Sequence, residues 1–238
     1  MNKNLSVVII AHNEEQNIGK VTEALEASYQ KEILEIVVVD DNSTDGTARI
    51  VEGLKKRYDN LRLVRRSPPP GVGRALKAGY AAVDRRAEYI LSMDSDFIYN
   101  VPQVARLIEG VEKGYDGAIG SRFTEGGELV NYPFLKKMMN RLFHFTARIL
   151  FNIKCKDLSN NFKLYKKEIF QKLPYSSNDF AMNAETGILP MIYGYRITEV
   201  PVSWIGRKAD MGSSKFKIWK CGPGYIKVLL SLLAKDRR

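Results

Sequence analysis

Cysteine and histidine are scarce in this sequence of 238 residues, which contains two of each. Cys155 and Cys221 are far apart and lack the short spacing of a metal-binding pair. The simplest interpretation is that both are reduced thiols in a cytosolic protein. His12 and His144 also stand alone, with no neighbours that complete a metal-binding set. These absences argue against a metal site built from cysteine or histidine.

The chain also lacks a long hydrophobic run, a linker and an internal repeat. No apolar stretch reaches the ~20 residues that a membrane-spanning helix needs. The first β-rich segment begins almost at Met1, so we expect no secretory signal before it. Without a Pro/Ser-rich linker, 238 residues fit one α/β domain, and we predict a single domain over 1–238.

Positive charge is in excess, with 37 Lys and Arg against 27 Asp and Glu and a net charge of +10. Such an excess favours anionic partners: nucleotide or lipid phosphates, an anionic membrane surface or nucleic acid. The basic residues are scattered, and no motif for binding RNA or DNA is present, so no nucleic acid is expected. A basic nucleic-acid-binding domain, or a nucleotide-sensing domain without turnover, remains the alternative of another class.

Apolar β-rich segments alternate with helical patterns through the first half of the chain. We predict strands over 5–11, 33–39 and 61–64, a strand starting at Tyr89, helices over 16–28, 47–58 and 74–85, and a helix–strand unit over 101–120. This alternation predicts right-handed crossovers and a parallel sheet.

The alternation stops after Gly120. We predict helices over 134–153 and 181–193, a polar loop over 157–162, a short strand over 163–165, a strand over 197–204 and a basic, glycine-bearing segment over 206–215. An apolar helix over 225–235 is flanked by Lys and Arg. It is too short to span a bilayer but can lie on one.

The strand that starts at Tyr89 ends in Asp94 and Asp96. Ligands of open α/β sheets bind at the carboxyl edge of the strands, and two close carboxylates are costly to bury without a cation. Mg²⁺ or Mn²⁺, held by one or two carboxylates and substrate phosphates, removes that cost. The alternative is a solvated turn, since Asp and Ser are common turn residues. Asp41 ends the second strand and should lie at the same edge.

Together these segments resemble the family 2 glycosyltransferases with a GT-A fold. The general pattern lies in residues 8–15, residues 37–47 and Met93-Asp94-Ser95-Asp96. The nearest likeness is to the polyprenyl-phosphate sugar synthases, dolichyl-phosphate mannose synthase among them, and covers nearly the whole chain. It is carried by residues 119–123, 126–127, 131–134, 157–159, 199–202 and 207–215.

The resemblance implies a nucleotide-diphospho-sugar transferase fold, with a Rossmann-like, mostly parallel sheet flanked by helices. It divides the single catalytic domain into a nucleotide-sugar part (1–122), an acceptor part (123–216) and an amphipathic C-terminal tail (217–238). It also implies a metal-dependent hexosyltransferase that moves mannose or glucose from GDP- or UDP-hexose to a polyprenyl or dolichyl phosphate. The protein would associate peripherally with the cytoplasmic membrane face. A glycan or other saccharide acceptor is the alternative.

The resemblance also implies roles for individual residues. Catalytic roles fall on Asp94, Asp96, Arg122, Arg207 and Lys215, with Asp94 and Asp96 as the metal ligands. Nucleotide-sugar contacts fall on Ala11, Asn13, Glu15, Asp41, Asp94 and Ser95. Acceptor contacts fall on Lys136, Asn140, Asp157, Ser159 and Glu185.

Three departures from the synthase pattern stand out. Ile98 replaces a Gln two residues beyond the second Asp, Ala11 replaces a Pro, and residues 159–162 (Ser-Asn-Asn-Phe) replace a Ser-Gly-Phe type loop. The synthases often have an arginine at Lys136, so the charge is kept there but not the bidentate geometry.

A phosphate acceptor is already anionic, whereas a sugar hydroxyl needs a general base. The only base candidates are Asp157 and Glu185, which mildly favours a phosphate acceptor. Structural alternatives remain open for several residues. Asp41 could interact with a helix dipole, Arg122 could form a surface ion pair and Glu185 could be a satisfied structural acid. Lys136 and Arg141 could extend from an apolar helix to water.

Overall fold

The structure is a computed structural model that describes residues 1–205 and 218–236. The first half alternates strands and helices: β1 (Leu5–Ala11), α1 (Ile18–Tyr29), β2 (Ile33–Asp40), α2 (Thr47–Leu54), β3 (Leu61–Arg65), α3 (Val72–Ala82) and β4 (Tyr89–Asp94). The second half contains η1 (Phe97–Gln103), α4 (Val104–Glu112), β5 (Gly117–Ser121), β6 (Glu128–Val130), α5 (Phe134–Phe151), β7 (Lys163–Lys166), α6 (Lys167–Lys172), α7 (Met182–Ile192), β8 (Ile197–Pro201), β9 (Ser203–Ile205) and α8 (Ile218–Asp236).

Seven strands form one mostly parallel sheet in the order β3-β2-β1-β4-β7-β5-β8. β1 is parallel to both β2 and β4, and β7 is antiparallel to β4 and β5. Ala11 pairs with Asp40, and Ile10 pairs with Asp94. This register puts the acidic ends of β2 and β4 on either side of the end of β1. The sequence predicted that these ends share one edge of the sheet, but not that β1 lies between them.

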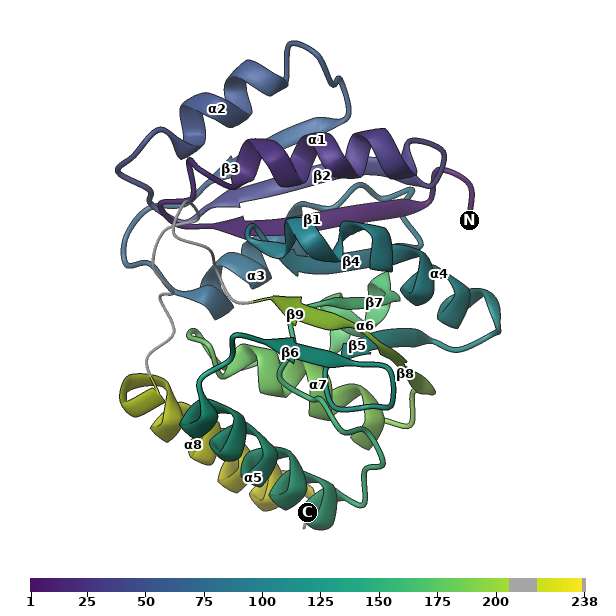
Figure 1. Ribbon diagram of the computed structural model, residues 1–238, viewed down its shortest axis with the longest axis vertical. Helices are drawn as coiled ribbons and strands as arrows, with labels where there is room; N and C mark the ends of the chain where they lie inside the picture. The colour runs from purple at the N-terminus through teal and green to yellow at the C-terminus, as the bar shows by residue number, and fades with distance from the viewer. Residues whose placement is uncertain (206–217, 237–238) are drawn as a thin grey trace.

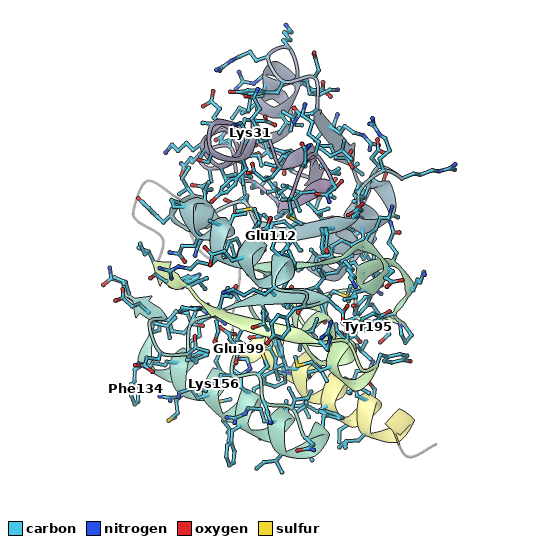
Figure 2. All side chains as sticks on the ribbon, turned by 90° about the vertical axis from the view of Figure 1, so that its right-hand side faces the viewer. Lys31, Glu112, Phe134, Lys156, Tyr195 and Glu199 are labelled. Atoms are coloured by element: carbon cyan, nitrogen blue, oxygen red, sulfur yellow. The ribbon has the colours of Figure 1, made fainter. Side chains whose placement is uncertain are left out.

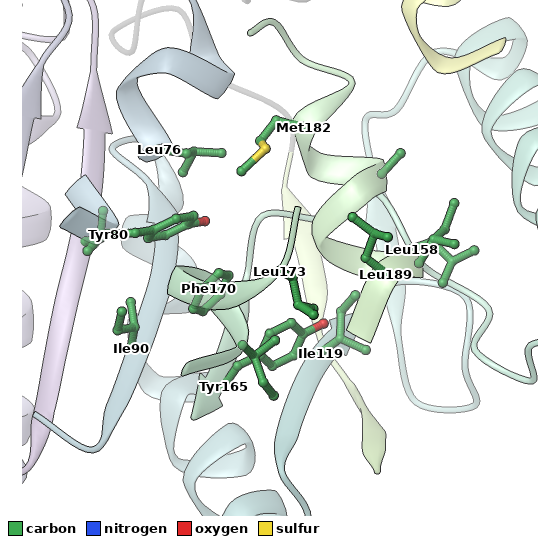
Figure 3. Close-up of a cluster of buried hydrophobic side chains, with 14 of the residues drawn as sticks. Leu76, Tyr80, Ile90, Ile119, Leu158, Tyr165, Phe170, Leu173, Met182 and Leu189 are labelled. Atoms are coloured by element: carbon green, nitrogen blue, oxygen red, sulfur yellow. The ribbon is translucent and has the colours of Figure 1, made fainter. Parts of the chain in front are cut away.

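Helices cover both faces of the sheet, so β1 is buried on both sides (Figure 1). Val7 and Ile9 pack in one apolar cluster with residues of α1, α2 and α4. Val8 and Ile10 belong to the other cluster, which includes Tyr80 and the residues drawn in Figure 3. A strand covered on both faces has to be apolar along its whole length, which explains why these strands were recognisable as continuous apolar runs.

The second half departs from the prediction in several respects: β6 and α6 were not predicted, and α8 begins at Ile218 and not at 225. The strand predicted over 197–204 is two strands: β8 joins the large sheet, and β9 pairs with β6 in a separate two-stranded sheet. The change of partner falls at Pro201 and Val202. Val202 donates its amide hydrogen bond to Ser121 and accepts one from Glu128 (3.0 and 3.2 Å), so the chain leaves β5 and continues beside β6.

α5 and α8 lie side by side at the end of the molecule opposite α2 (Figure 1). α8 contributes Val228, Leu229 and Leu232 to the core, and Phe143 of α5 contacts Tyr225 edge-on at 5.1 Å between ring centroids. Neither helix, nor any other in the described part of the chain, is long and apolar enough to cross a bilayer. Neither Cys155 nor Cys221 forms a disulfide in the described part of the chain.

Candidate active site

A cavity of about 520 Å³ opens at the carboxyl edge of β1, β2 and β4. Nine of the predicted site residues line it: Ala11, Asp41, Asp94, Ser95, Asp96, Arg122, Lys136, Asn140 and Ser159. The cavity wall opposite the strand ends comes from α5, α8 and the start of α7. Residues far apart in the sequence therefore meet around one space, with acidic side chains at the sheet edge and Lys136 on α5.

Asp94 and Asp96 both line this cavity, one at the end of β4 and the other at the start of η1. In the described part of the chain, no group of three or more His, Cys, Asp or Glu side chains is arranged to hold a metal ion. A divalent cation here would take two carboxylates and complete its oxygen shell with substrate phosphates and water. That donor set suits Mg²⁺ or Mn²⁺, which are commonly bound in this way, so the residues present fit the predicted ion.

A buried chain of hydrogen bonds leads to Asp94. The Ser92 hydroxyl donates to Asn161 Oδ1 (2.8 Å), and Asn161 Nδ2 donates to Asp94 Oδ1 (2.8 Å). Because the Ser92 proton is used in this way, the Tyr80 hydroxyl must donate to Ser92 over 2.9 Å. Every donor therefore points towards the carboxylate. The sequence prediction missed Asn161, although it lies in the loop that departs from the synthase pattern.

Asp41 lines the cavity, but its carboxylate is already engaged by described residues. Its carboxylate pairs with Arg66 and accepts the amide hydrogen bond of Gly71 (2.6 Å). The His12 ring nitrogen Nδ1 donates to the Asp41 carbonyl over 2.8 Å. Asp41 thus holds the 66–71 loop at the rim of the cavity. Any contact with a nucleotide stays a prediction.

Asn13 and Glu15, predicted to contact the nucleotide sugar, are not among the residues that line the cavity. Asn13 Oδ1 accepts the amide hydrogen bond of Thr44 (2.8 Å), and Glu15 Oε2 accepts that of Gly46 (2.8 Å). Both side chains tie the loop after β1 to the loop after β2. In the structure, Asn13 and Glu15 thus support the rim of the cavity and do not face its interior.

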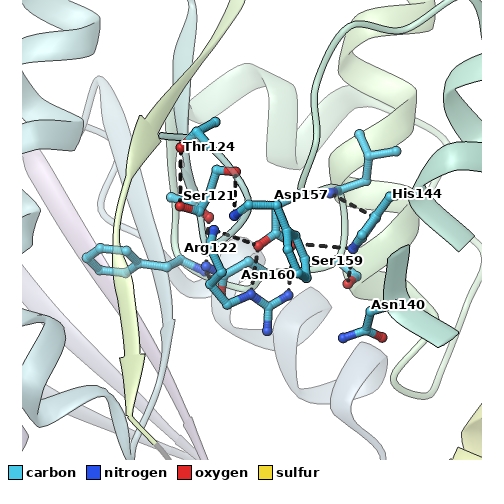
Figure 4. Close-up of polar contacts among 12 residues, drawn as sticks. Ser121, Arg122, Thr124, Asn140, His144, Asp157, Ser159 and Asn160 are labelled. Atoms are coloured by element: carbon cyan, nitrogen blue, oxygen red, sulfur yellow. Dashed lines mark hydrogen bonds and ion pairs between the residues drawn. The ribbon is translucent and has the colours of Figure 1, made fainter. Parts of the chain in front are cut away.

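Arg122 and Asp157 form a buried, bidentate ion pair. Arg122 Nε and Nη2 donate to the two carboxylate oxygens over 2.7 and 2.8 Å, and its amide adds a third hydrogen bond of 3.0 Å (Figure 4). Burial alone would raise the pKa of Asp157, but the Arg122 charge and hydrogen bonds outweigh it and leave the pKa below its ordinary value. Asp157 is 0% exposed and does not line the cavity, whereas Arg122 does.

His144 adjoins this pair from α5. Its Nδ1 accepts the amide hydrogen bond of Leu158 (3.3 Å), so the ring proton is on Nε2, 3.5 Å from Asp157 Oδ1. Burial lowers the pKa of His144 to about 4, against the opposing effect of Asp157. The ring is therefore neutral near pH 7. The surface ion pair considered for Arg122 is instead a buried network of three side chains.

Lys136 brings a cation to the cavity. Its Nζ lies 5.0 Å from the Tyr132 ring centroid and 5.8 Å from that of Trp204. Burial lowers the pKa of Lys136 to about 8, and the neighbouring Arg122 charge acts in the same direction. Asn140, one turn along α5, donates to the Tyr132 hydroxyl over 2.6 Å. The two rings were not predicted as site residues.

Glu185 is buried in α7 and does not line the cavity. Its carboxylate accepts hydrogen bonds from the Ser176 amide, the Ser176 hydroxyl and the Ser177 amide, at 2.8, 2.7 and 3.0 Å. This geometry favours the alternative of a satisfied structural acid over the predicted acceptor contact. Arg207 and Lys215 fall outside the described residues.

Comparisons with known proteins identify similar glycosyltransferases. The profile described as "Glycosyl transferase family 2" matches residues 6–174. The chain is 27% identical to polyprenol monophosphomannose synthase of Mycolicibacterium smegmatis, over 88% of this chain and 79% of that protein. It is 30% identical to dolichol-phosphate mannosyltransferase of Pyrococcus furiosus, over 90% of this chain but 59% of that protein. It is 25% identical to undecaprenyl-phosphate mannosyltransferase of Micrococcus luteus, over 93% of this chain and 90% of that protein.

A solved structure supports the fold. Glucosyl-3-phosphoglycerate synthase from Mycobacterium tuberculosis, in complex with Mn²⁺, uridine diphosphate and phosphoglyceric acid, superposes on this chain with a TM-score of 0.73. The superposition covers 98% of this chain and 78% of that one, at 19% sequence identity. The likeness extends over the whole sheet and its flanking helices.

Proposed function

The chain belongs to glycosyl transferase family 2 and is therefore a glycosyltransferase with a GT-A fold, and we propose that it moves a hexose from a nucleotide diphosphate sugar to a polyprenyl phosphate. Mannose or glucose is the proposed sugar, GDP or UDP the nucleotide, and a dolichyl-type lipid the acceptor. The three mannose-transferring relatives carry polyprenyl or dolichol phosphates in their names, which supports this acceptor class.

One observation carries the proposal: acidic and basic side chains line the same cavity from opposite sides. Asp94 and Asp96 stand at the sheet edge, and Lys136 stands on α5. A nucleotide diphosphate at the acids and an acceptor phosphate at the lysine would share one space. The nucleotide and the lipid phosphate would then meet across the sugar that is transferred.

The proposed reaction forms a bond between an acceptor phosphate oxygen and the anomeric carbon, and it breaks the bond between that carbon and the donor diphosphate. No proton has to leave the acceptor, because the attacking phosphate oxygen is already ionised. Asp157 and Glu185, the two acids considered as bases from the sequence, are both engaged inside the protein and do not line the cavity. Glu14 and Asp179 do line it, so the choice of a phosphate acceptor over a sugar hydroxyl is supported by Lys136 and by the names of the relatives.

Mg²⁺ or Mn²⁺, held by Asp94 and Asp96, would supply positive charge to the departing diphosphate. The chain of hydrogen bonds from Tyr80 through Ser92 and Asn161 would hold the Asp94 carboxylate in place for that ion. Lys136 would attract the acceptor phosphate, and the Tyr132 and Trp204 rings would keep its ammonium group at the cavity. The ion pair of Arg122 and Asp157 would hold the cavity wall between the metal ion and the acceptor phosphate in place.

A lipid-linked acceptor places the reaction at a bilayer. The proposal therefore includes peripheral association with the cytoplasmic membrane face.

A screen of nucleotide sugars for diphosphate release tests the proposal. We expect release from one GDP- or UDP-hexose to rise when a short-chain polyprenyl phosphate and Mn²⁺ or Mg²⁺ are both present. Asp96→Asn should abolish that release, while Asp59→Asn, an equal change of charge on the exposed surface, should not. Release that depends on a saccharide instead of the lipid phosphate would overturn the acceptor assignment. Metal-independent release would overturn the role of the two acids.

A further inference from the structure

One face of α5 is apolar and exposed. Phe134, Met138, Leu142, Phe145 and Ile149 follow each other at intervals of three or four residues, so they share one side of the helix. Phe134 is 79% exposed and Ile149 is 65% exposed. Exposed apolar patches of this kind mark contact sites, because soluble surfaces seldom leave them in water.

A second cavity, also of about 520 Å³, borders this stripe. Three cationic side chains line it: Arg141 and Arg148 from α5, and Lys156 from the loop that follows. Among the described residues, no acidic side chain lines it, and none of the three cations forms an ion pair. Arg148 Nε is buried without a hydrogen-bond partner in the described part of the chain.

The remaining lining is mostly apolar and includes Met138, Leu142 and Phe145 from the exposed stripe. The cavity therefore offers three positive charges beside a hydrocarbon surface. This combination fits an amphiphile with an anionic head and an apolar tail. Guanidinium groups bind phosphate oxygens through paired hydrogen bonds, which makes a phosphate the best-matched head group.

We propose that this second cavity binds the phosphate of an anionic bilayer phospholipid, with the apolar face of α5 in contact with the acyl chains. The inference rests on the proposed function, because a lipid-linked acceptor requires the enzyme to work at a bilayer. A second copy of this chain is a poorer occupant. A symmetric contact through this face would bring two sets of the same uncompensated cations together.

α8, which packs beside α5, also exposes apolar side chains. Ile226 and Leu230 are 60% and 63% exposed, and Lys227 is exposed beside them. α5 also carries Lys136 and Asn140 on the wall of the first cavity. A helix anchored by its outer face would thus present its inner face to the acceptor. In Figure 2, Phe134 and Lys156 lie at the end of the molecule opposite Lys31.

Vesicle flotation tests the site. The wild-type protein should float with vesicles of phosphatidylcholine and phosphatidylglycerol, and much less with phosphatidylcholine alone. Because each basic residue at an anionic surface contributes about 1 kcal/mol, Arg141→Gln with Arg148→Gln should weaken binding roughly thirty-fold. Lys31→Gln with Lys56→Gln removes the same charge from the far end of the molecule and should leave binding within about twofold.

A separate variant tests the apolar part. Leu142→Ser with Phe145→Ser changes two exposed side chains and should also lower flotation, without lowering the melting temperature. Deleting α8 is not a clean test, since Val228, Leu229 and Leu232 belong to the core. Inorganic phosphate at millimolar concentration should not displace the vesicles. Displacement by phosphate would indicate a site for a small soluble anion and would overturn the lipid assignment.

Equal losses for the α5 pair and the Lys31 pair would also overturn the inference, because they would show a general charge effect. So would concentration-dependent dimerisation that the α5 substitutions abolish. The proposed function can be judged apart from these results. Sugar transfer to a short-chain, water-dispersed polyprenyl phosphate should persist in the Arg141 and Arg148 double variant. Its absence in the wild type would count against the proposed function and not against this site.

Discussion

Asn161 Nδ2 donates a hydrogen bond to Asp94 Oδ1 over 2.8 Å and connects β4 with the loop before β7. Asn161 is 2% exposed and receives the Ser92 proton on its own oxygen, so its amide cannot turn without losing both bonds. The carboxylate predicted to hold a metal ion is therefore held by a side chain that touches the cavity itself. Partners that orient metal ligands in this way commonly affect metal affinity.

Asn161→Ala should weaken Mn²⁺ binding in the presence of GDP or UDP by about tenfold or more, the usual effect of losing such a partner. Isothermal titration of Mn²⁺ into the protein measures this directly and does not depend on turnover. Tyr80→Phe removes only the first donor of the chain and should change Mn²⁺ affinity much less. Unchanged Mn²⁺ affinity in Asn161→Ala, with an unchanged melting temperature, would remove Asn161 from the site.

Lys136 should make acceptor binding depend on pH. Because its pKa is lowered to about 8, the side chain is charged below pH 8 and loses its charge above it. The KM for the polyprenyl phosphate should thus rise about tenfold from pH 7 to pH 9, as the charged fraction falls. Lys136→Arg keeps the charge over that range and should flatten the profile. A wild-type KM that stays constant up to pH 9 would separate Lys136 from acceptor binding.

The first half of the fold was predictable because its signals are local. β2 was predicted over 33–39 and is found at Ile33–Asp40, since a strand buried on both faces has to be an unbroken apolar run. The end of β8 was missed because Pro201 marks a change of partner that depends on β6. β6 is three residues long, which is too short for a recognisable alternation of apolar and polar residues.

The candidate site also combines residues with a local sequence signal and residues whose contacts depend on the fold. The spacing of Asp94 and Asp96 at the end of one predicted strand indicated either a metal site or a solvated turn, and the structure places both side chains at the cavity. The partner of Arg122 lies 35 positions away, and only the fold reveals that Asp157 is buried beside it. Glu185 has an acidic side chain in an apolar helix, and its sequence context does not disclose that Ser176 already engages it.

The pair of Arg122 and Asp157 should contribute far more to stability than exposed pairs do. Asp157→Asn leaves a buried guanidinium without its counter-charge, which should lower the free energy of unfolding by about 3–5 kcal/mol. Glu168→Gln breaks an exposed pair with Lys172 in α6 and should cost about 0.5 kcal/mol or less. Urea unfolding of both variants provides the comparison. Equal losses would show that burial does not strengthen the dependence of Arg122 on its partner.

Gly187 should tolerate no side chain. A Cβ at this position in α7 would overlap the carbonyl group of Leu158, next to Asp157. Gly187→Ala should therefore destabilise the protein by about 3 kcal/mol and disturb the loop that holds Asp157. Gly53→Ala is the matched control in α2, where nothing lies within 4 Å, and it should stabilise by about 0.5 kcal/mol. Melting temperatures that shift in the same direction would contradict this reading of the contact.

His144 should make the protein sensitive to mild acid. Its pKa is about 4 in the folded protein and 6.5 in the unfolded chain, so the unfolded chain takes up the proton first as the pH falls. The stabilisation from the neutral ring is complete above pH 6.5 and is lost between pH 6.5 and 4. At about 1.4 kcal/mol for each pH unit, the loss from His144 alone amounts to about 3 kcal/mol.

His144→Asn isolates this contribution, because the Asn oxygen can still accept the Leu158 amide hydrogen bond but does not titrate. The variant should be less stable than the wild type at pH 7, since it fills less of the space between α5 and Asp157. Its free energy of unfolding should then fall less steeply between pH 6.5 and 4, so that the two curves converge on acidification. Parallel curves would mean that the acid sensitivity comes from carboxylates common to both proteins, and that the proton on His144 is not coupled to folding.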